Sequence, residues 1–344
     1  MRTRTFSALC TIVSGISAAA ALAGCSGAGS ASSASGPPPE RRVLTVDAVP
    51  TAEEGGFYAA QAEGFFAQQG LTVKIKSITG GEAGIPDLQS GKAQLVAGNY
   101  VAFILAQMAG EFHGKHADLR IIAAGSEIQP GSEALYVKPH SKYKTVAELA
   151  RAHAKIGLNT ANDVGDVMVG ELLTQAGYSL KEIRRVTPTA GFPALVTMLA
   201  SGKVDAAWLP QPLGETAEQR TGAVPLADFD QGSLQGLPFT GFFGTAQWVK
   251  THPATVAAFL RALTEGQRLA DTDRAAVEAA MRTYTGISPL VSDTMALDEY
   301  PLAMDVPQLQ RVANSMFEFG LTPRAKKPYR ISLMIQREPG LVGG

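Results

Sequence analysis

Four loops in this sequence have the backbone and side chains needed to hold a small polar molecule. Each loop follows a β-type apolar run and precedes a segment with helical periodicity, so each should expose free N–H groups at the start of a helix. Such N–H groups, with the positive end of the helix dipole, bind polar or anionic atoms. The four loops are residues 51–55, 80–84, 159–162 and 189–191.

The side chains in and near these loops are acidic or neutral, and none of the loops contains Lys or Arg. Uncompensated carboxylates in a partly dry cleft repel an anion, so we expect a neutral or cationic ligand such as an amine-bearing heterocycle. Backbone amides can also hold sulfonate or nitrate, and a Glu at a helix start can simply be a solvated residue favoured by the dipole. The polar candidates are Thr51, Glu53, Glu54, Gly80, Gly81, Glu82, Asn99, Glu127, Asn159, Thr160, Asn162 and Gln211.

Three aromatic residues stand at comparable positions. Tyr100 follows Asn99, Phe192 opens a predicted helix, and Trp208 ends a predicted strand. Flat ligands bind between such rings because stacking buries area at little entropic cost. We expect two of the three rings to line the ligand site and the other to belong to the core.

Motifs for catalysis or metal binding are absent from the sequence. It contains no His-Glu-x-x-His, no phosphate-binding P-loop, no nucleophile elbow and no Gly-x-Gly-x-x-Gly. His113 and His116 have a spacing that could bind a metal, but no further ligands accompany them, and a polar surface turn is the better interpretation. We therefore expect a binding protein with no cofactor, no metal and no catalytic residue.

An internal repeat predicts how the loops are positioned. Residues 84–94 are echoed by 191–205, and upstream residues 66–70 match 173–177 in the same order. The matched segments are separated by roughly 107 to 111 residues, which indicates two similar units. Strands alternate with helices in each unit, so we predict an α/β fold of two doubly wound lobes with the ligand cleft between them.

The elements expected along the chain set the lobe boundaries. Thr145 and Thr160 should each open a helix with a Thr-x-x-acid cap. Crossings near 136–139 and 236–241 should form a two-segment hinge, which gives lobe 1 residues 43–138 and 239–344, and lobe 2 residues 139–238. The expected strands are 43–47, 71–78, 93–97, 119–124, 134–138, 155–158, 183–187, 204–208 and 239–243, and the expected helices include 57–69, 84–90, 253–270, 274–284 and 307–319.

The N-terminal segment is typical of an export signal. Arg2 and Arg4 precede an apolar run over 6–22 that small and polar residues interrupt, so residues 1–24 are predicted to be a signal peptide rather than a spanning helix. Residues 25–42 are rich in Ser, Gly and Pro and are predicted to form a flexible tether. An ordinary signal peptide cleaved elsewhere is the alternative.

Composition excludes some classes of function. The formal net charge is −1 and charged residues make up 18% of the chain, without a basic stripe, so nucleic acid is not an expected partner. The sequence has two cysteines, Cys10 and Cys25. If Cys10 is removed with the signal peptide and the Cys25 thiol carries a lipid, no thiol is left for a disulfide or a metal. We expect a monomer.

The sequence resembles the type 2 periplasmic solute-binding proteins of ABC importers, in the group that binds sulfonates, nitrate, taurine and the pyrimidine precursor of thiamine. The resemblance covers about residues 43–320. The motifs that carry it are Asp47, Pro50, Gly56, the segment 58–66, Gly80-Gly81, the segment 199–206 and the segment 251–263. In addition, Leu22-Ala23-Gly24-Cys25 resembles the bacterial lipobox, which implies that Cys25 is diacylated and anchored to the outer face of the cell membrane.

This resemblance implies a lipoprotein that captures a small organic solute, preferably a neutral or cationic heterocycle such as the thiamine-precursor pyrimidine, for a permease and an ATPase. In the pyrimidine-binding branch a Trp, an Asn and a His line the first loop, whereas this sequence has Ala48, Thr51 or Glu53, and Glu54 at those positions. A binder of sulfonate, taurine or nitrate is therefore kept as an alternative. Two other classes are a pyrimidine synthase-like enzyme, which in its family consumes its own His and needs iron, and a ligand-sensing lipoprotein.

Overall fold

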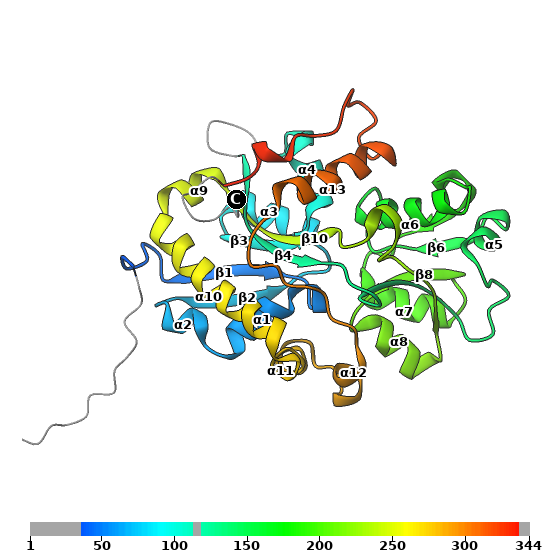
Figure 1. Ribbon diagram of the computed structural model, residues 1–344, viewed down its shortest axis with the longest axis horizontal. Helices are drawn as coiled ribbons and strands as arrows, with labels where there is room; N and C mark the ends of the chain where they lie inside the picture. The colour runs from blue at the N-terminus through cyan, green and yellow to red at the C-terminus, as the bar shows by residue number, and fades with distance from the viewer. Residues whose placement is uncertain (1–35, 113–117, 337–344) are drawn as a thin grey trace, which may run out of the picture. The chain divides into compact units, whose positions relative to one another are not determined.

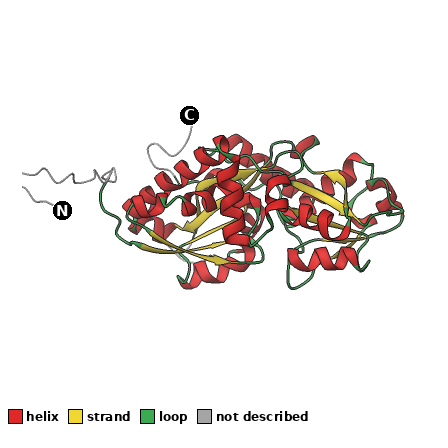
Figure 2. Ribbon diagram, turned by 90° about the horizontal axis from the view of Figure 1, so that it is seen from below, coloured by secondary structure: helices red, strands yellow, loops and turns green. Residues whose placement is uncertain are grey.

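The computed structural model describes residues 36–112 and 118–336. The predictions for Cys25 and for the pair His113 and His116 lie outside the described residues. Two five-stranded sheets, with helices on both faces, form the two lobes (Figures 1 and 2). Among the helices of the described ranges, none combines the length and the apolar character that crossing a membrane requires.

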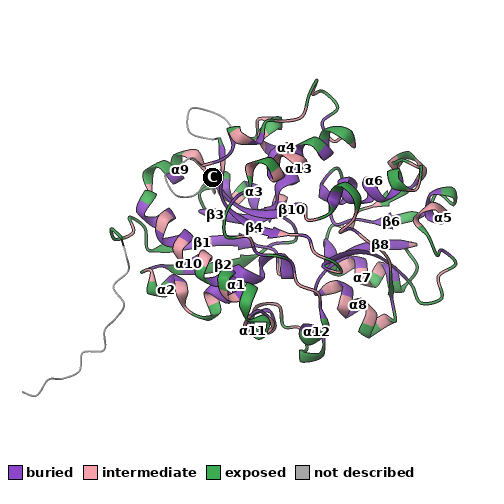
Figure 3. Ribbon diagram, in the orientation of Figure 1, coloured by how far each residue is buried: buried purple, intermediate pink, exposed green. Residues whose placement is uncertain are grey.

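The first sheet has the strand order β2-β1-β3-β10-β4. β1, β2 and β3 run parallel, and β10 is antiparallel to both β3 and β4, so the predicted return of the chain to the first lobe is confirmed. β1, β3, β4 and β10 are buried along most of their length because helices cover both faces, whereas the edge strand β2 is mostly exposed (Figure 3). The bounds are β1 Val43–Ala48, β2 Thr72–Ser77, β3 Leu95–Asn99, β4 Leu119–Glu127 and β10 Pro238–Thr245.

Two sets of helices cover this sheet (Figure 1). On one face, Phe57, Phe66 and Phe259 pack with strand residues such as Phe242. The helices Pro253–Thr272 and Arg274–Thr285 bury one side because their apolar residues have amphipathic spacing, whereas the helix Gly55–Ala62 is buried over most of its residues. The first set is α1 Gly55–Ala62, α2 Phe65–Gln68, α10 Pro253–Thr272 and α11 Arg274–Thr285; the second is α3 Ile85–Ser90, α4 Tyr100–Ala109 and α13 Val306–Glu318. The remaining helices of this lobe are α9 Ala246–Thr251 and α12 Pro289–Thr294.

The second sheet repeats the arrangement of the first, with the order β7-β6-β8-β5-β9. β6, β7 and β8 are parallel, and β5 is antiparallel to β8 just as β10 is antiparallel to β3. The repeat in the sequence is thus confirmed at the level of strand order. The strands are β5 Glu133–Val137, β6 Lys155–Gly157, β7 Arg184–Val186, β8 Ala206–Pro210 and β9 Val224–Asp228, and the helices are α5 Val146–Arg151, α6 Val164–Gln175, α7 Phe192–Ala200 and α8 Leu213–Thr221.

The crossings between the sheets lie earlier than predicted. β4 ends at Glu127 in the first sheet and β5 begins at Glu133 in the second, so the first crossing precedes the expected 136–139. β5 belongs to the second lobe because it pairs with both β8 and β9. The return crossing lies between Asp228 and Pro238, ahead of most of the expected 236–241.

Two local predictions are also corrected. The expected helix over 57–69 is broken, since Gly64 adopts a left-handed φ of 72° that ends α1 and separates it from α2. Thr160 does not cap α6; Asp163 is the N-cap and Thr160 contacts the other lobe. Thr145 does cap α5 by accepting from the Glu148 N–H, whereas the Glu148 carboxylate accepts from the N–H of Lys144 rather than from that of Thr145.

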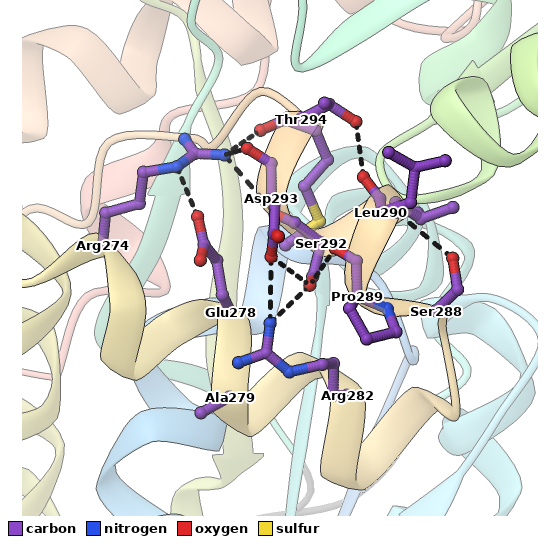
Figure 4. A network of polar contacts seen from close by, with 12 residues as sticks. Arg274, Glu278, Ala279, Arg282, Ser288, Pro289, Leu290, Ser292, Asp293 and Thr294 are labelled. Carbon is purple, nitrogen blue, oxygen red and sulfur yellow. Dashed lines mark hydrogen bonds and ion pairs between the residues drawn. The ribbon is translucent and has the colours of Figure 1, made fainter.

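A polar network holds the segment that follows α11 (Figure 4). Arg274 bonds the Glu278 carboxylate at 2.7 Å and also donates to the carbonyl of Met295. Arg282 donates to Ser292 Oγ at 2.6 Å and to Asp293 Oδ1 at 3.2 Å. Both guanidinium groups on α11 therefore fix α12 and the loop after it.

Candidate ligand-binding site

The edge of each sheet at which the parallel strands end carries the candidate site. Glu53 and Glu54 lie on the short 3-10 helix η1 (Ala52–Glu54), which follows β1. Glu133 begins the antiparallel strand β5 opposite Pro210, the last residue of β8, so it lies at the corresponding edge of the second sheet. Ligands bind at such edges in open α/β sheets because loops and helix N-termini converge there.

Five buried carboxylates, which we call the carboxylate cluster, come from separate parts of the chain. Between 0% and 6% of each residue is exposed. Within the described residues, no Lys, Arg or His forms an ion pair with any of them. Buried charges are ordinarily paired, so this group lacks the counter-charge that burial demands. The cluster consists of Glu53, Glu54, Glu133, Asp163 and Asp298.

The hydrogen bonds to the cluster leave most of its oxygens without a partner. Trp208 donates its indole N–H to Glu133 Oε2, and Asn99 Nδ2 donates to Asp163 Oδ2 at 3.2 Å. Both carboxylate oxygens of Glu54 and of Asp298 have no hydrogen-bond partner within the described structure. A buried polar group without a partner costs about 1–3 kcal/mol, and a charged group costs more. These oxygens are therefore buried acceptors that a ligand could satisfy.

Burial raises the pKa of every member of the cluster, and neighbouring carboxylates raise those of Glu53, Glu54, Glu133 and Asp163 further. Burial, and then the negative charge of Asp298, raise the pKa of Glu53 to about 8. Burial likewise raises the pKa of Asp298 to about 7, and burial together with Glu82 raises that of Asp163 to about 7. The pKa of Glu54 and of Glu133 is also raised well above the ordinary value, first by burial and then by neighbouring carboxylates. A positive charge in the cluster would reverse these shifts.

Direct contacts join the two lobes around the cluster. The backbone N–H of Ala52 donates to the carbonyl of Gln211 at 2.8 Å. Thr160 Oγ1 donates to Glu82 Oε1 at 2.6 Å. The bond between Asn99 and Asp163 is a further contact between the lobes. The site is therefore built from both lobes, and its geometry depends on how they meet.

An apolar cavity of about 320 Å³ adjoins these contacts. The first lobe contributes the ends of β1 and β2, and the second lobe contributes the starts of α7 and α8. The volume is at the lower end of the range for small-ligand pockets. The lining residues are Val49, Pro50, Thr51, Ser77, Ile78, Thr79, Phe192, Pro193, Pro212, Leu213, Thr285 and Ile287.

Most of the residues predicted from the sequence are brought together here. Among the aromatic candidates, Phe192 lines the cavity and its ring lies edge-on to that of Trp208, with centroids 4.8 Å apart. Tyr100 is buried, and its hydroxyl has no partner within the described structure. The polar candidates that lie at the cluster or in the contacts around it are Thr51, Glu53, Glu54, Glu82, Asn99, Thr160 and Gln211.

The other predicted residues lie outside the cluster, or are glycines that matter for the course of the backbone. Asn162 is exposed, and Asn159 is buried with a side-chain oxygen that has no partner in the described structure. Burial, and then Glu299, raise the pKa of Glu127 to about 7, and its neighbouring charges differ from those of the cluster. Gly80 has an extended backbone, and Gly81 packs so closely that a Cβ atom there would lie 3.2 Å from the Cα of Gly98.

Three members of the cluster were not among the predicted site residues. Glu133 gives a weak signal, as a charged residue directly before the apolar run 134–137. The sequence predicts that Asp163 takes part in a helix cap, and it is the N-cap of α6, but its side chain also bonds Asn99 of the other lobe. Asp298 has no local signal at all, since only the chain path brings the loop after α12 to the cluster.

The cluster does not form a metal centre in the described part of the chain. There, no three His, Cys, Asp or Glu side chains come together in a way that could hold a metal ion. The separate carboxylates instead match a ligand that carries positive charge or several N–H donors over more than one atom.

Solved structures of binding proteins are similar to this chain in fold. The alkanesulfonate-binding protein SsuA of Xanthomonas axonopodis pv. citri, bound to MOPS, is 18% identical with a TM-score of 0.73, over 87% of this chain and 99% of that one. The zinc-bound ligand-binding component of an ABC-type import system from Staphylococcus aureus is 11% identical with a TM-score of 0.72, over 86% and 97%. The nitrate-binding protein NrtA of Synechocystis PCC 6803 is 14% identical with a TM-score of 0.70, over 84% of each chain.

These likenesses show that the chain has the periplasmic binding protein fold. No curated protein matches the sequence. The family model described as NMT1/THI5 like matches residues 51–273, which include both sheets in large part and four of the five cluster residues. The chain belongs to the NMT1/THI5-like family.

Proposed function

We propose that this protein is the exported solute-binding component of an ABC importer and that its solute is a small organic molecule with a cationic or N–H-rich group. The observation that carries the ligand class is the carboxylate cluster, five buried acids without a cationic partner in the described structure. Family membership and the fold shared with sulfonate- and nitrate-binding proteins support the transport role. The protein acts as a monomer and delivers its solute to a permease and an ATPase.

Electrostatics favours a cation over the anions that the structural neighbours bind. Two unit charges 4 Å apart interact by about 4 kcal/mol at an effective dielectric constant of 20. An anion near Glu53, Glu54 or Asp298 would meet repulsion of that order from each ionised carboxylate, whereas an ammonium group would gain attraction. The protein desolvates these carboxylates when it folds, before the ligand arrives. The attraction that an ammonium group gains on binding therefore offsets a cost that folding has already incurred.

An aminopyrimidine fits the same chemistry. Its amino group can donate to an ionised carboxylate, and its ring nitrogen can accept from a protonated carboxyl group. Raised pKa values of about 7 and 8 at Asp298 and Glu53 allow both protonation states near neutral pH. The thiamine-precursor pyrimidine therefore remains the first candidate among heterocycles, and capture without turnover is the expected activity.

A thermal-shift screen of the purified protein tests the ligand class. Primary amines and aminopyrimidines should raise the melting temperature, because a ligand that binds only the folded state stabilises it by mass action. Taurine, MOPS, nitrate and Zn²⁺ form the comparison panel. Stabilisation by sulfonates or nitrate alone would overturn the proposed ligand class, and recovery of a chemically altered heterocycle would replace capture by catalysis.

Replacement of Cys25 tests the proposed anchor. Cys25→Ala removes the thiol that would carry the lipid, so the protein should move from the membrane fraction to the soluble fraction or the medium. Cys10→Ala is the matched control, since Cys10 lies inside the predicted signal, and this variant should stay in the membrane fraction. Fractionation followed by immunoblotting measures both, and a membrane-bound Cys25→Ala protein would refute the anchor.

A further inference from the structure

The apolar cavity of about 320 Å³ lies beside the carboxylate cluster rather than in an unrelated part of the molecule. Thr51 lines the cavity and stands two residues before Glu53. Thr51 is 2% exposed, and its hydroxyl oxygen has no hydrogen-bond partner within the described structure. A buried hydroxyl without a partner at the wall of a cavity is available to bond a ligand atom there.

A second connection runs through the aromatic residues. Phe192 lines the cavity, and its ring lies edge-on to Trp208. Trp208 in turn donates its indole N–H to Glu133 of the cluster. The cavity is thus joined to the cluster on two sides, by Thr51 next to Glu53 in the first lobe and by Phe192 and Trp208 next to Glu133 in the second.

The remaining wall residues are apolar and come from both lobes. Val49 and Ile78 are 5% and 7% exposed and belong to the first lobe, and Leu213 begins α8 of the second lobe. Ile287 lies between α11 and α12. The guanidinium groups of Arg274 and Arg282 on α11 bond α12 and the residue that follows it (Figure 4). A group that fills the cavity would touch both lobes and would favour the arrangement in which they meet.

We propose that this cavity is a second subsite, and that the ligand is an amphipathic cation whose charged or N–H-rich group binds the carboxylate cluster while a compact apolar group occupies the cavity. The inference rests on the proposed function and names the ligand class more closely. Polar polyamines and amino acids do not fit this arrangement, because their second charge would enter an apolar space. Arylalkyl and branched alkyl amines and alkyl-substituted heterocycles do fit.

Calorimetric titration with two amines of equal charge tests the subsite. Benzylammonium should bind the wild-type protein at least about tenfold more tightly than methylammonium, since only the former has a group to bury in the cavity. Leu213→Asn, which places an amide in the cavity wall, should remove most of that advantage and leave the methylammonium affinity within about twofold. Ile287→Trp, which fills the cavity, should act in the same direction.

The control variant changes an apolar residue outside the cavity. Leu290 lies on α12 and is 62% exposed, so Leu290→Asn should keep the full preference for benzylammonium. Equal affinities of the two amines for the wild-type protein would overturn the subsite and leave the proposed function intact. Failure of both amines to bind a protein with a normal melting curve would overturn the proposed function itself. A Leu213→Asn protein that melts normally and retains the wild-type ratio would also contradict the subsite.

Discussion

Replacing Glu54 with Gln should stabilise the ligand-free protein and abolish its capture of amines. Glu54 is 1% exposed and neither of its carboxylate oxygens has a hydrogen-bond partner within the described structure. Its neighbours Glu53 and Asp298 are themselves acidic and raise its pKa further. At a pH that ionises Glu54, a neutral amide of the same shape removes the buried charge and can donate to those neighbours, which should raise the free energy of unfolding by roughly 1–3 kcal/mol.

The same substitution should weaken amine binding by at least about 30-fold, because loss of one member of a buried charge pair costs about 2–5 kcal/mol. Scanning fluorimetry and calorimetric titration measure the two effects on one sample. A gain in stability together with a loss of affinity indicates a carboxylate that binds the ligand. A loss of stability would indicate a carboxylate that supports the fold.

Glu218→Gln serves as the matched control for Glu54→Gln. Glu218 is a half-buried acid of α8 whose pKa is also raised, first by burial and then by Glu215, and it lies outside the cluster. This variant should leave amine affinity within about twofold of wild type. A Glu54→Gln protein that melts at a lower temperature and still binds amines would show that the cluster stabilises the fold and is not the ligand site.

The stability of the ligand-free protein should fall as the pH rises from about 5 to about 8, while its affinity for a permanently charged amine should increase. The pKa of Glu53 is about 8 and those of Asp163 and Asp298 are about 7 in the folded protein, whereas unfolded carboxyl groups titrate near 4. Between these values the folded state binds more protons than the unfolded state, so each rise in pH favours unfolding.

For these coupled groups together we expect a loss of roughly 2–4 kcal/mol, or about 4–8 °C in melting temperature for a domain of this size. Benzyltrimethylammonium is a suitable probe because its own charge does not change with pH. The double variant Glu53→Gln and Glu54→Gln should make both pH profiles shallower, while Asp163 and Asp298 still titrate. Melting temperatures that rise over this pH range would mean that the cluster is charged and stabilised by a partner that the proposal does not include.

The sequence by itself determined the arrangement of the elements and the chemical character of the site. The echo between residues 84–94 and 191–205 predicted two like units, and both sheets have the same strand order because similar local patterns form similar strands and helices. The sequence also predicted where the loops lie. Glu53 and Glu54 come after β1, at the edge of the sheet where ligands bind in open α/β folds. The absence of Lys and Arg from these loops already favoured a cation.

Only the tertiary structure decided which other side chains join them. Glu133 is brought to the cluster by the pairing of β5 with β8, and Asp298 by the path of the chain after α12, which no local pattern encodes. Thr160 has the spacing of a helix cap and instead donates to Glu82 in the other lobe. Periodicity and capping act over a few residues, whereas the charge of the site depends on contacts between lobes that are distant in sequence. For that reason the acidic bias of two loops became a cluster of five buried carboxylates only when both lobes were in place.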